Sequence, residues 1–142
     1  MMNIRISQAT WEADKEPLMA IRHQVFIVEQ QVPPEIEIDE ADPEAIHFLA
    51  LEHSGKAIGT CRLLLTGKIG RVAVLKPWRG KGIGRNLMQA AMQHAAERGL
   101  QMVSLDAQCS SREFYEKLGF EGVGEIFEEV GMPHIKMVAE VE

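Results

Sequence analysis

The chain has 142 residues, of which 46% are hydrophobic and 25% charged, and its formal net charge is -6. This length suits one domain, and no apolar run approaches the ~18 residues that a membrane span needs. The acidic balance argues against a nucleic-acid-binding protein, whose surface usually carries a surplus of basic residues. We therefore expect one domain with no nucleic-acid partner and no membrane partner.

The N-terminus and the cysteines indicate the cellular setting. The first residues alternate between apolar and polar types and lack the long apolar stretch of a secretory signal, which predicts a cytoplasmic protein. Cys61 and Cys109 lie far apart and form no C-x-x-C pair. Neither a disulfide nor a metal site is therefore expected, and both cysteines are predicted to be small buried residues.

The first half of the chain reads as a strand, a helix, a loop and three strands. Ile4 and Ile6 alternate with polar neighbours, which predicts a short first strand, and Thr10 can cap a helix over residues 11–28. An acidic, proline-bearing loop follows over residues 31–44, and loops of this length are often functional. An antiparallel meander is predicted next, broken by glycine-containing turns, with strands at residues 45–52, 57–65 and 68–75.

The second half of the chain alternates helices and strands. A helix is predicted over residues 83–98, with Gly99 placed to end it. A strand at residues 102–107 follows, which is the pattern of a right-handed crossover between parallel strands. A second helix comes next, and the chain ends with strands at residues 120–123 and 135–141.

Residues 68–85, KIGRVAVLKPWRGKGIGR, contain no acid. The glycines of this segment leave a strand and enter a helix, so side-chain-free backbone can close on a ligand while the N-terminal amides of the helix point at it. Helix N-termini of this kind bind phosphate groups. The segment therefore predicts an anion site, and its basic residues are Lys68, Arg71, Lys76, Arg79, Lys81 and Arg85.

Two common phosphate-binding motifs fit this segment less well. A Walker loop would need glycine at position 75, where the chain has Leu75. A dinucleotide fingerprint fits Gly80 and Gly82, but Arg85 then stands where a glycine or alanine should pack the helix on the strand. Asp106 lies at a suitable distance for the acid of that fingerprint, so a dinucleotide-binding protein stays open as an alternative.

The spacing R-x-x-G-x-G over residues 79–84, after the V-A-V strand at residues 72–74, resembles the acyl-CoA motif of the GNAT superfamily of N-acetyltransferases. Residues 114–120, FYEKLGF, are similar to the second signature of that family, on the helix after the next strand. The two motifs occur in the family's order. The resemblance in element order covers nearly the whole chain.

This resemblance implies an α/β fold of the α+β type. Its central mixed sheet is mostly antiparallel, with six or seven strands, a parallel pair at its centre and about four flanking helices. Residues 1–142 would form a single N-acetyltransferase domain. The implied activity moves the acetyl group of acetyl-CoA to a primary amine by direct attack in a ternary complex, and a homodimer is compatible with the family. A different class, an acyl-CoA-binding sensor or interaction module without turnover, stays open.

The resemblance also implies the cofactor-binding residues. The strand before the glycines would offer backbone groups to the pantetheine arm, and the turn and its basic side chains would hold the pyrophosphate. Gln108 stands where many relatives have asparagine, and its amide would reach the cofactor arm. The implied set is Val72, Ala73, Val74, Arg79, Gly80, Lys81, Gly82, Ile83, Gly84, Arg85 and Gln108.

Acetyl transfer needs a proton for the departing thiolate, a site for the oxyanion and a base for the amine. Tyr115, the single tyrosine, matches the family position whose phenol approaches the thioester sulfur. A backbone N–H near Val74 would hold the oxyanion. His134 is predicted to be a catalytic residue. The identity of the general base stays open, and the candidates are Glu37, Asp39, His47, Asp106 and His134.

The acidic loop lies where the family builds its acceptor site. Its carboxylates would attract a cationic amine, or they form a solvated loop. Arg22 and Glu29 flank the end of the first helix and are predicted to be surface residues, with acceptor contacts as the alternative.

Overall fold

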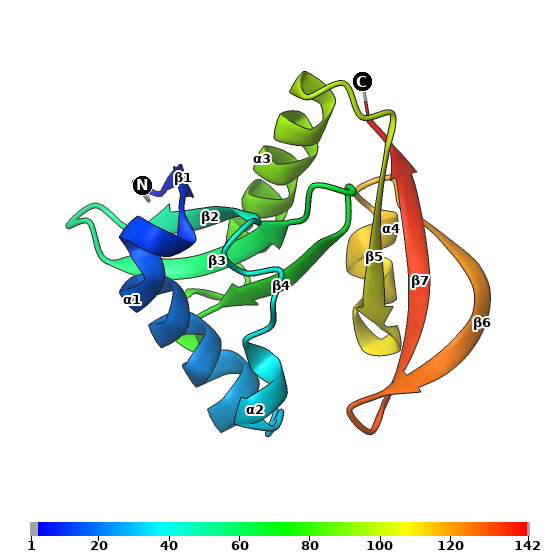
Figure 1. Ribbon diagram of the computed structural model, residues 1–142, viewed down its shortest axis with the longest axis horizontal. Coiled ribbons are helices and arrows are strands. Elements are labelled where there is room, and N and C mark those ends of the chain that lie inside the picture. Colours follow the sequence, from blue (N-terminus) through cyan, green and yellow to red (C-terminus); the bar gives the residue numbers. More distant parts are fainter. Residues whose placement is uncertain (1–2, 142) are drawn as a thin grey trace.

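Two antiparallel sheets form the framework of the protein (Figure 1). The computed structural model describes residues 3–141. The first sheet has the strand order β1-β2-β3-β4, and the second has the order β5-β7-β6. The strands are β1 (Arg5–Ala9), β2 (Ile46–Leu51), β3 (Ala57–Leu63), β4 (Ile69–Val74), β5 (Met102–Gln108), β6 (Glu121–Glu129) and β7 (Met132–Glu140).

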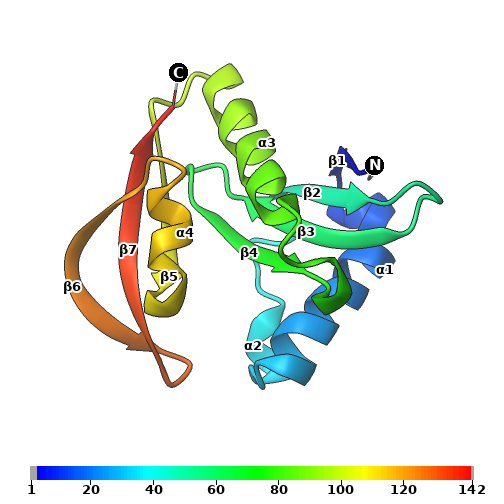
Figure 2. The same ribbon diagram turned by 180° about the vertical axis from the view of Figure 1, so that it is seen from behind.

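The two sheets are joined where β4 and β5 begin. These strands run parallel, and among residues 3–141 they are bridged at one position, between Lys68 and Ser104. The amide of Ser104 donates a hydrogen bond to the carbonyl of Gly67 over 3.1 Å. Beyond this point the strands separate, as both views show (Figures 1 and 2). The predicted parallel pair is confirmed, but it is confined to this one bridge just before β4, and the expected central sheet is divided in two.

The predicted helices occur in the predicted order, and α2 is an additional short helix within the predicted loop of residues 31–44. Thr10 caps α1, because its hydroxyl accepts a hydrogen bond from the amide of Ala13 at 3.1 Å. The helix predicted over residues 11–28 is formed by α1 and a π-helical turn, η1, in direct succession. No helix within the described range is long and apolar enough to cross a membrane. The helical segments are α1 (Trp11–Arg22), η1 (His23–Glu29), α2 (Pro34–Glu37), η2 (Lys76–Trp78), α3 (Ile83–Glu97), η3 (Cys109–Ser111) and α4 (Arg112–Glu116).

The core lies on both faces of the first sheet. Leu87 and Ala91 of α3 are fully buried against one face, together with Ile58 of β3. Leu18 of α1 is buried against the other face. Figures 1 and 2 show α1 and α3 on opposite sides of this sheet.

The two cysteines differ from each other. Cys61 is fully buried, as predicted, and its thiol lies 3.5 Å from the carbonyl oxygen of Leu87. Cys109 is half-buried, so the prediction for this residue is wrong. Cys109 opens η3 at the end of β5, where the chain leaves the second sheet.

The C-terminal hairpin is longer than the sequence indicates. Strands were expected at residues 120–123 and 135–141, whereas β6 and β7 extend over Glu121–Glu129 and Met132–Glu140. β6 is an edge strand that is exposed along nearly its whole length, so it lacks the alternating burial that reveals a strand. Gly124 has φ of +78° and interrupts the pairing register with β7, which hides the pattern further.

An arginine-centred ion network fixes the loop between η1 and β2. Arg22 is buried, and its Nε and Nη1 lie 2.8 Å from carboxylate oxygens of Glu37 and Asp42. Arg62 of β3 extends the network through contacts of 2.7 Å with Asp39 and 3.0 Å with Asp42. The prediction that Arg22 lies on the surface is therefore wrong. Its partners follow 15 to 20 residues later in the chain.

The pKa of Asp42 reflects this network. Burial alone would raise the pKa of this carboxyl, but the hydrogen bonds and charges of Arg22 and Arg62 outweigh burial and lower it from 3.8 to about 2. A folded-state pKa below the unfolded value contributes stability that is present above the unfolded pKa. The contribution of Asp42 is therefore complete at neutral pH, and it is lost as the pH falls from about 4 to about 2.

The substitution Arg22→Leu should leave two buried carboxylates without their main cation. We expect the free energy of unfolding to fall by about 3 kcal/mol or more, the cost of breaking a buried ion pair from one side. Urea unfolding at neutral pH measures this change. Arg98→Leu, at an exposed position beyond α3, is the matched control and should change stability by less than about 0.5 kcal/mol. Equal losses in the two variants would contradict a stabilising network at Arg22.

Candidate active site

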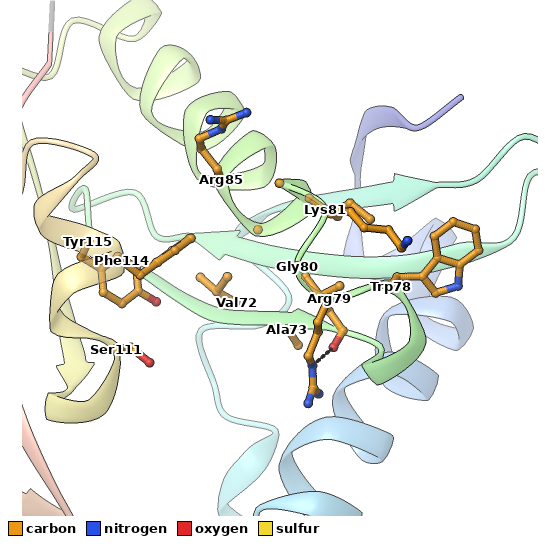
Figure 3. Close-up of a pocket in the computed structure, with 14 residues that line it drawn as sticks. Val72, Ala73, Trp78, Arg79, Gly80, Lys81, Arg85, Ser111, Phe114 and Tyr115 are labelled. Carbon is orange, nitrogen blue, oxygen red and sulfur yellow. Dashed lines mark hydrogen bonds between the residues drawn. The ribbon is translucent and has the colours of Figure 1, made fainter. Parts of the chain in front are cut away.

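A first cavity lies where β4 ends and α3 begins. Its volume is about 680 Å³. One wall is the strand segment of residues 72–74, the floor is the turn of residues 78–85, and the opposite wall comes from η3 and α4 (Figure 3). Every residue of the predicted cofactor set except Gln108 lines this cavity, and Trp78, Ser111, Phe114 and Tyr115 complete the lining.

The glycine turn presents backbone to this cavity. Gly80 and Gly82 have φ of +77° and +82°, a left-handed conformation that glycine adopts without the cost borne by other residues. Gly82 is also the N-cap residue of the 15-residue helix α3, whose first turn contains no acid. The N-terminal amides and the helix dipole therefore make this end of the cavity an anion site.

The basic side chains around the turn point in different directions (Figure 3). Arg79 turns away from the glycines, because its Nε donates to the carbonyl of Val74 at 2.8 Å and its Nη2 lies 2.9 Å from a carboxylate oxygen of Glu29. Lys81 and Arg85 flank the turn and form no ion pair with the described residues. Their charges are therefore the ones available to an anion in the first cavity.

The edge of β4 that faces the second sheet has free backbone groups. The amide of Leu75 donates to the carbonyl of Ile58 in β3, so by the alternation of an antiparallel pair the amide of Val74 points to the opposite edge. The register of β3 and β4 shifts near Arg71, whose φ is +52°, which marks a β-bulge. The open edge can therefore donate hydrogen bonds to an extended ligand.

A second cavity, of about 530 Å³, lies on the other side of the opening between the sheets. It shares Val72, Ser111 and Tyr115 with the first cavity, so the two meet at these three residues. The rest of its lining comes from η1, α2, β3, β4, β5 and the β6–β7 hairpin. A ligand in one cavity can therefore contact a ligand in the other at this junction.

Tyr115 is the titratable residue at the junction. Burial, with a smaller contribution from Cys61, raises the pKa of its phenol to about 12. The ring is held edge-to-face between Phe114 and Phe120, with centroid distances of 5.0 and 6.0 Å. The phenol is therefore protonated at neutral pH and can act as a hydrogen-bond donor toward the shared space.

His134 lies in the lining of the second cavity. Its Nδ1 is 2.8 Å from the carbonyl of Met132, and because a carbonyl only accepts, Nδ1 carries the proton in the neutral ring. Nε2 then carries the lone pair, and it lies 4.0 Å from a carboxylate oxygen of Glu129. The ring is buried and stacks on Phe127 at 5.9 Å. This geometry suits a proton acceptor.

The carboxylates predicted as alternative bases are committed to ion pairs. Glu37 and Asp39 contact arginines, and Asp106 lies 2.9 Å from Lys68. The pKa of Asp39 is lowered, because the hydrogen bond and charge of Arg62 outweigh the opposing effect of burial. A carboxylate with a lowered pKa is a weaker base, so Asp39 suits proton transfer less well.

The histidine predicted as another base lies elsewhere. His47 is outside both cavities, buried against Trp11, with its Nε2 2.9 Å from the carbonyl of Asp42. Burial lowers its pKa. The structure therefore does not bring His47 together with the other predicted site residues.

Gln108 lines the second cavity and not the first. Its Nε2 donates to the side-chain oxygen of Gln30 at 3.3 Å, which links β5 to the end of η1. Ser111 and Glu129 were not among the predicted site residues, although both line the second cavity. Ser111 lies three residues before Phe114 of the second signature, and Glu129 lies in the strand that the sequence did not reveal.

The single tyrosine allows the phenol to be titrated directly. Tyrosinate ultraviolet absorbance of the folded protein should reach its midpoint near pH 12, about 2 units above a free tyrosine. In urea the midpoint should return to about 10. A folded protein half-ionised at about pH 10 would contradict the buried environment of Tyr115.

Comparison with known proteins places this arrangement in a family. The model of the acetyltransferase (GNAT) domain matches residues 12–141. The Bacillus subtilis protein YyaT is 34% identical over 97% of each chain, and the uncharacterized N-acetyltransferase YjcF of the same organism is 36% identical over 83% of this chain and 86% of its own.

Solved structures agree with the sequence comparisons. An acyl-CoA N-acyltransferase from Pseudomonas aeruginosa superposes with a TM-score of 0.85, at 31% identity over 96% of this chain and 99% of that one. Escherichia coli ElaA superposes with a TM-score of 0.86, at 29% identity over 97% and 100%. The resemblance inferred from the two sequence motifs is confirmed, and the chain belongs to the GNAT acetyltransferase family.

Proposed function

We propose that this protein transfers the acetyl group of acetyl-CoA to a primary amine by direct attack, with the thioester in the first cavity and the amine in the second. The observation that carries this proposal is the junction of the two cavities at Val72, Ser111 and Tyr115. Two reactants bound on either side meet there without leaving the protein. Such positioning removes much of the entropic cost of a bimolecular reaction.

The glycine turn supports the binding of the pyrophosphate of coenzyme A. The amides after Gly82, with Lys81 and Arg85, offer the donors and charges that a diphosphate requires. The open edge of β4 offers amides to the pantetheine arm, which can lie along the strand in an extended conformation. The amide of Val74 lies on that edge and is our candidate for the oxyanion donor.

The chemical step forms a C–N bond and breaks a C–S bond. The amine nitrogen attacks the thioester carbonyl carbon, and its proton passes to Nε2 of His134. Collapse of the oxyanion expels the thiolate. Because the pKa of Tyr115 is about 12, above that of an ordinary thiol, its phenol is a weak acid toward this group and stabilises it mainly as a hydrogen-bond donor. The thiolate gains its proton through Tyr115 or Ser111, with solvent as the final source.

Binding of acetyl-CoA should depend on the glycine at position 82. The nearest contact of a Cβ built at Gly82 is the side chain of Arg85, at 3.4 Å, so the free protein has room for a methyl group. The methyl group would, however, occupy space that the bound phosphate needs. We expect Gly82→Ala to weaken acetyl-CoA binding roughly tenfold or more, a loss of about 1.4 kcal/mol. Calorimetric titration with acetyl-CoA, and with NAD in parallel, measures this.

The matched control is Gly55→Ala. Gly55 has a similar φ of +91°, has no atom within 4 Å of a built Cβ, and lies in the turn between β2 and β3. This variant carries the same backbone strain and should bind acetyl-CoA normally. Equal weakening in both variants, or a preference of the wild-type protein for NAD, would reject the proposed cofactor site.

Turnover should depend on the phenol at position 115. Tyr115→Phe keeps the ring packed between its aromatic neighbours and removes the donor, so we expect kcat to fall roughly 100-fold with unchanged acetyl-CoA affinity. The assay is release of free coenzyme A with a panel of primary amines. Ser111→Ala is the comparison, since its hydroxyl lines the same junction. A normal rate in Tyr115→Phe together with a large loss in Ser111→Ala would assign the role to Ser111.

This panel also tests the non-catalytic alternative. Acetyl-CoA binding without turnover of any amine would favour a sensor or interaction module. Acetylation of one or more amines would reject it.

A further inference from the structure

The second cavity contains one carboxylate that has no arginine or lysine partner among the described residues. Four acids line the cavity: Glu37, Asp39, Asp106 and Glu129. The first three lie within 3.3 Å of an arginine or lysine nitrogen. Glu129 contacts only His134, at 4.0 Å, and its side chain is 52% exposed. Among the described residues, Glu129 is therefore the lining acid whose charge is left for a ligand.

The arginines and the lysine that line the cavity already have carboxylate partners. Arg62 and Arg71 contact Glu37, Asp39 and Asp42, and Lys68 contacts Asp106. Four carboxylates therefore line the cavity against three arginine and lysine side chains, and a ligand with a carboxylate or phosphate would add to the excess of negative charge. An ammonium group meets the free charge of Glu129 without breaking any ion pair. The charge balance therefore favours a cationic ligand without an anionic substituent.

A second, independent feature points to the same ligand. His134 is 6% exposed, and its Nε2, which carries the lone pair, has no hydrogen-bond partner among residues 3–141. This nitrogen is not among the fully buried polar atoms, and because His134 lines the second cavity, Nε2 can accept a hydrogen bond from an incoming N–H donor. An ammonium donates to both Nε2 and the carboxylate of Glu129, so the pair would hold the amine at the atom that accepts its proton.

The rim of the cavity is apolar on two sides. Ile36 of α2 is 49% exposed and Val130 at the tip of the β6–β7 hairpin is 42% exposed, and both line the cavity. Phe26 and Val32 add apolar surface beside Ile36. Figures 1 and 2 show α2 and the hairpin tip at the same end of the molecule, on the two sides of the opening. Apolar side chains at these positions suit an apolar body attached to the amine.

We infer that Glu129 selects the acceptor, and that the acceptor is a primary amine, protonated in solution, on an apolar aliphatic or aromatic body with no carboxylate beside the amine. This inference rests on the proposed function. Glu129 recruits the ammonium, which loses one proton to solvent before attack, and the proton released on attack passes to His134. Glu129 is therefore a specificity-determining residue and takes no part in bond making. Glu37 and Asp39, the predicted loop acids that line the cavity, already have arginine partners and are therefore less available to the amine than Glu129.

The test compares three acceptors of graded chemistry. 2-Phenylethylamine carries the predicted features, phenylalanine adds a carboxylate beside the amine, and ethanolamine lacks the apolar body. For the wild-type enzyme we expect kcat/KM to be highest for 2-phenylethylamine, by roughly tenfold or more over each of the others. Comparable values for phenylalanine or ethanolamine would overturn the assignment.

The decisive variant is Glu129→Gln. Because Glu129 is about half exposed, solvent weakens its attraction for a cation, and we expect KM for 2-phenylethylamine to rise about fivefold with little change in kcat or in acetyl-CoA affinity. The advantage over phenylalanine should shrink by the same factor. His134→Gln should instead lower kcat for every amine.

Glu128→Gln is the matched control. It makes the same change of charge on the neighbouring residue of β6, which is exposed and does not line the cavity. If Glu129→Gln and Glu128→Gln raised KM equally, the effect would come from the general negative charge of β6. That result would overturn the specific role of Glu129. A wild-type protein that acetylates no amine would reject the proposed function itself. If the wild-type enzyme turns over amines and Glu129→Gln leaves KM unchanged, only the role of Glu129 in acceptor selection is rejected.

Discussion

The separation of β4 from β5 is the constraint on which the rest of the molecule depends. Parallel strands joined through a helix normally pair along their length, and a free edge of buried backbone is costly. Here pairing ends after the bridge at Lys68 and Ser104. The backbone groups released by this separation face an opening that the two cavities share. The free backbone groups can therefore form hydrogen bonds with a ligand that would lie between the sheets like an added strand.

The arginine network determines the charge of one wall of the second cavity. Arg22, Arg62 and Arg71 anchor the loop that carries α2, and in doing so they neutralise the acids that the sequence offers most prominently. The lining acids of this wall, Glu37 and Asp39, are therefore paired, whereas Glu129 of the hairpin opposite has no arginine or lysine partner among the described residues. Under the proposed function, stability and acceptor choice would fall to different residues, so that one could change without the other.

Local patterns made most of the lining of the first cavity predictable from the sequence. Gly80 and Gly82 need a particular backbone conformation, and the absence of acids around them is visible in one stretch of chain. The acceptor side depends on contacts between distant residues. Arg22 is buried only because its partners return to it from the loop after η1, and no periodicity of the helix indicates this. Glu129 lies in an edge strand whose exposure removes the alternation by which strands are recognised.

The same exposed strand affects how the protein behaves toward copies of itself. A nine-residue edge offers unpaired backbone groups along which another strand could add. β6 carries Glu121, Glu125, Glu128 and Glu129, all exposed. A second copy laid along this edge would bring its own glutamates against them, and like charges across adjacent strands repel. The acidity of β6 therefore guards against chain-to-chain sheet extension, and it keeps the hairpin free to serve as one wall of the cavity.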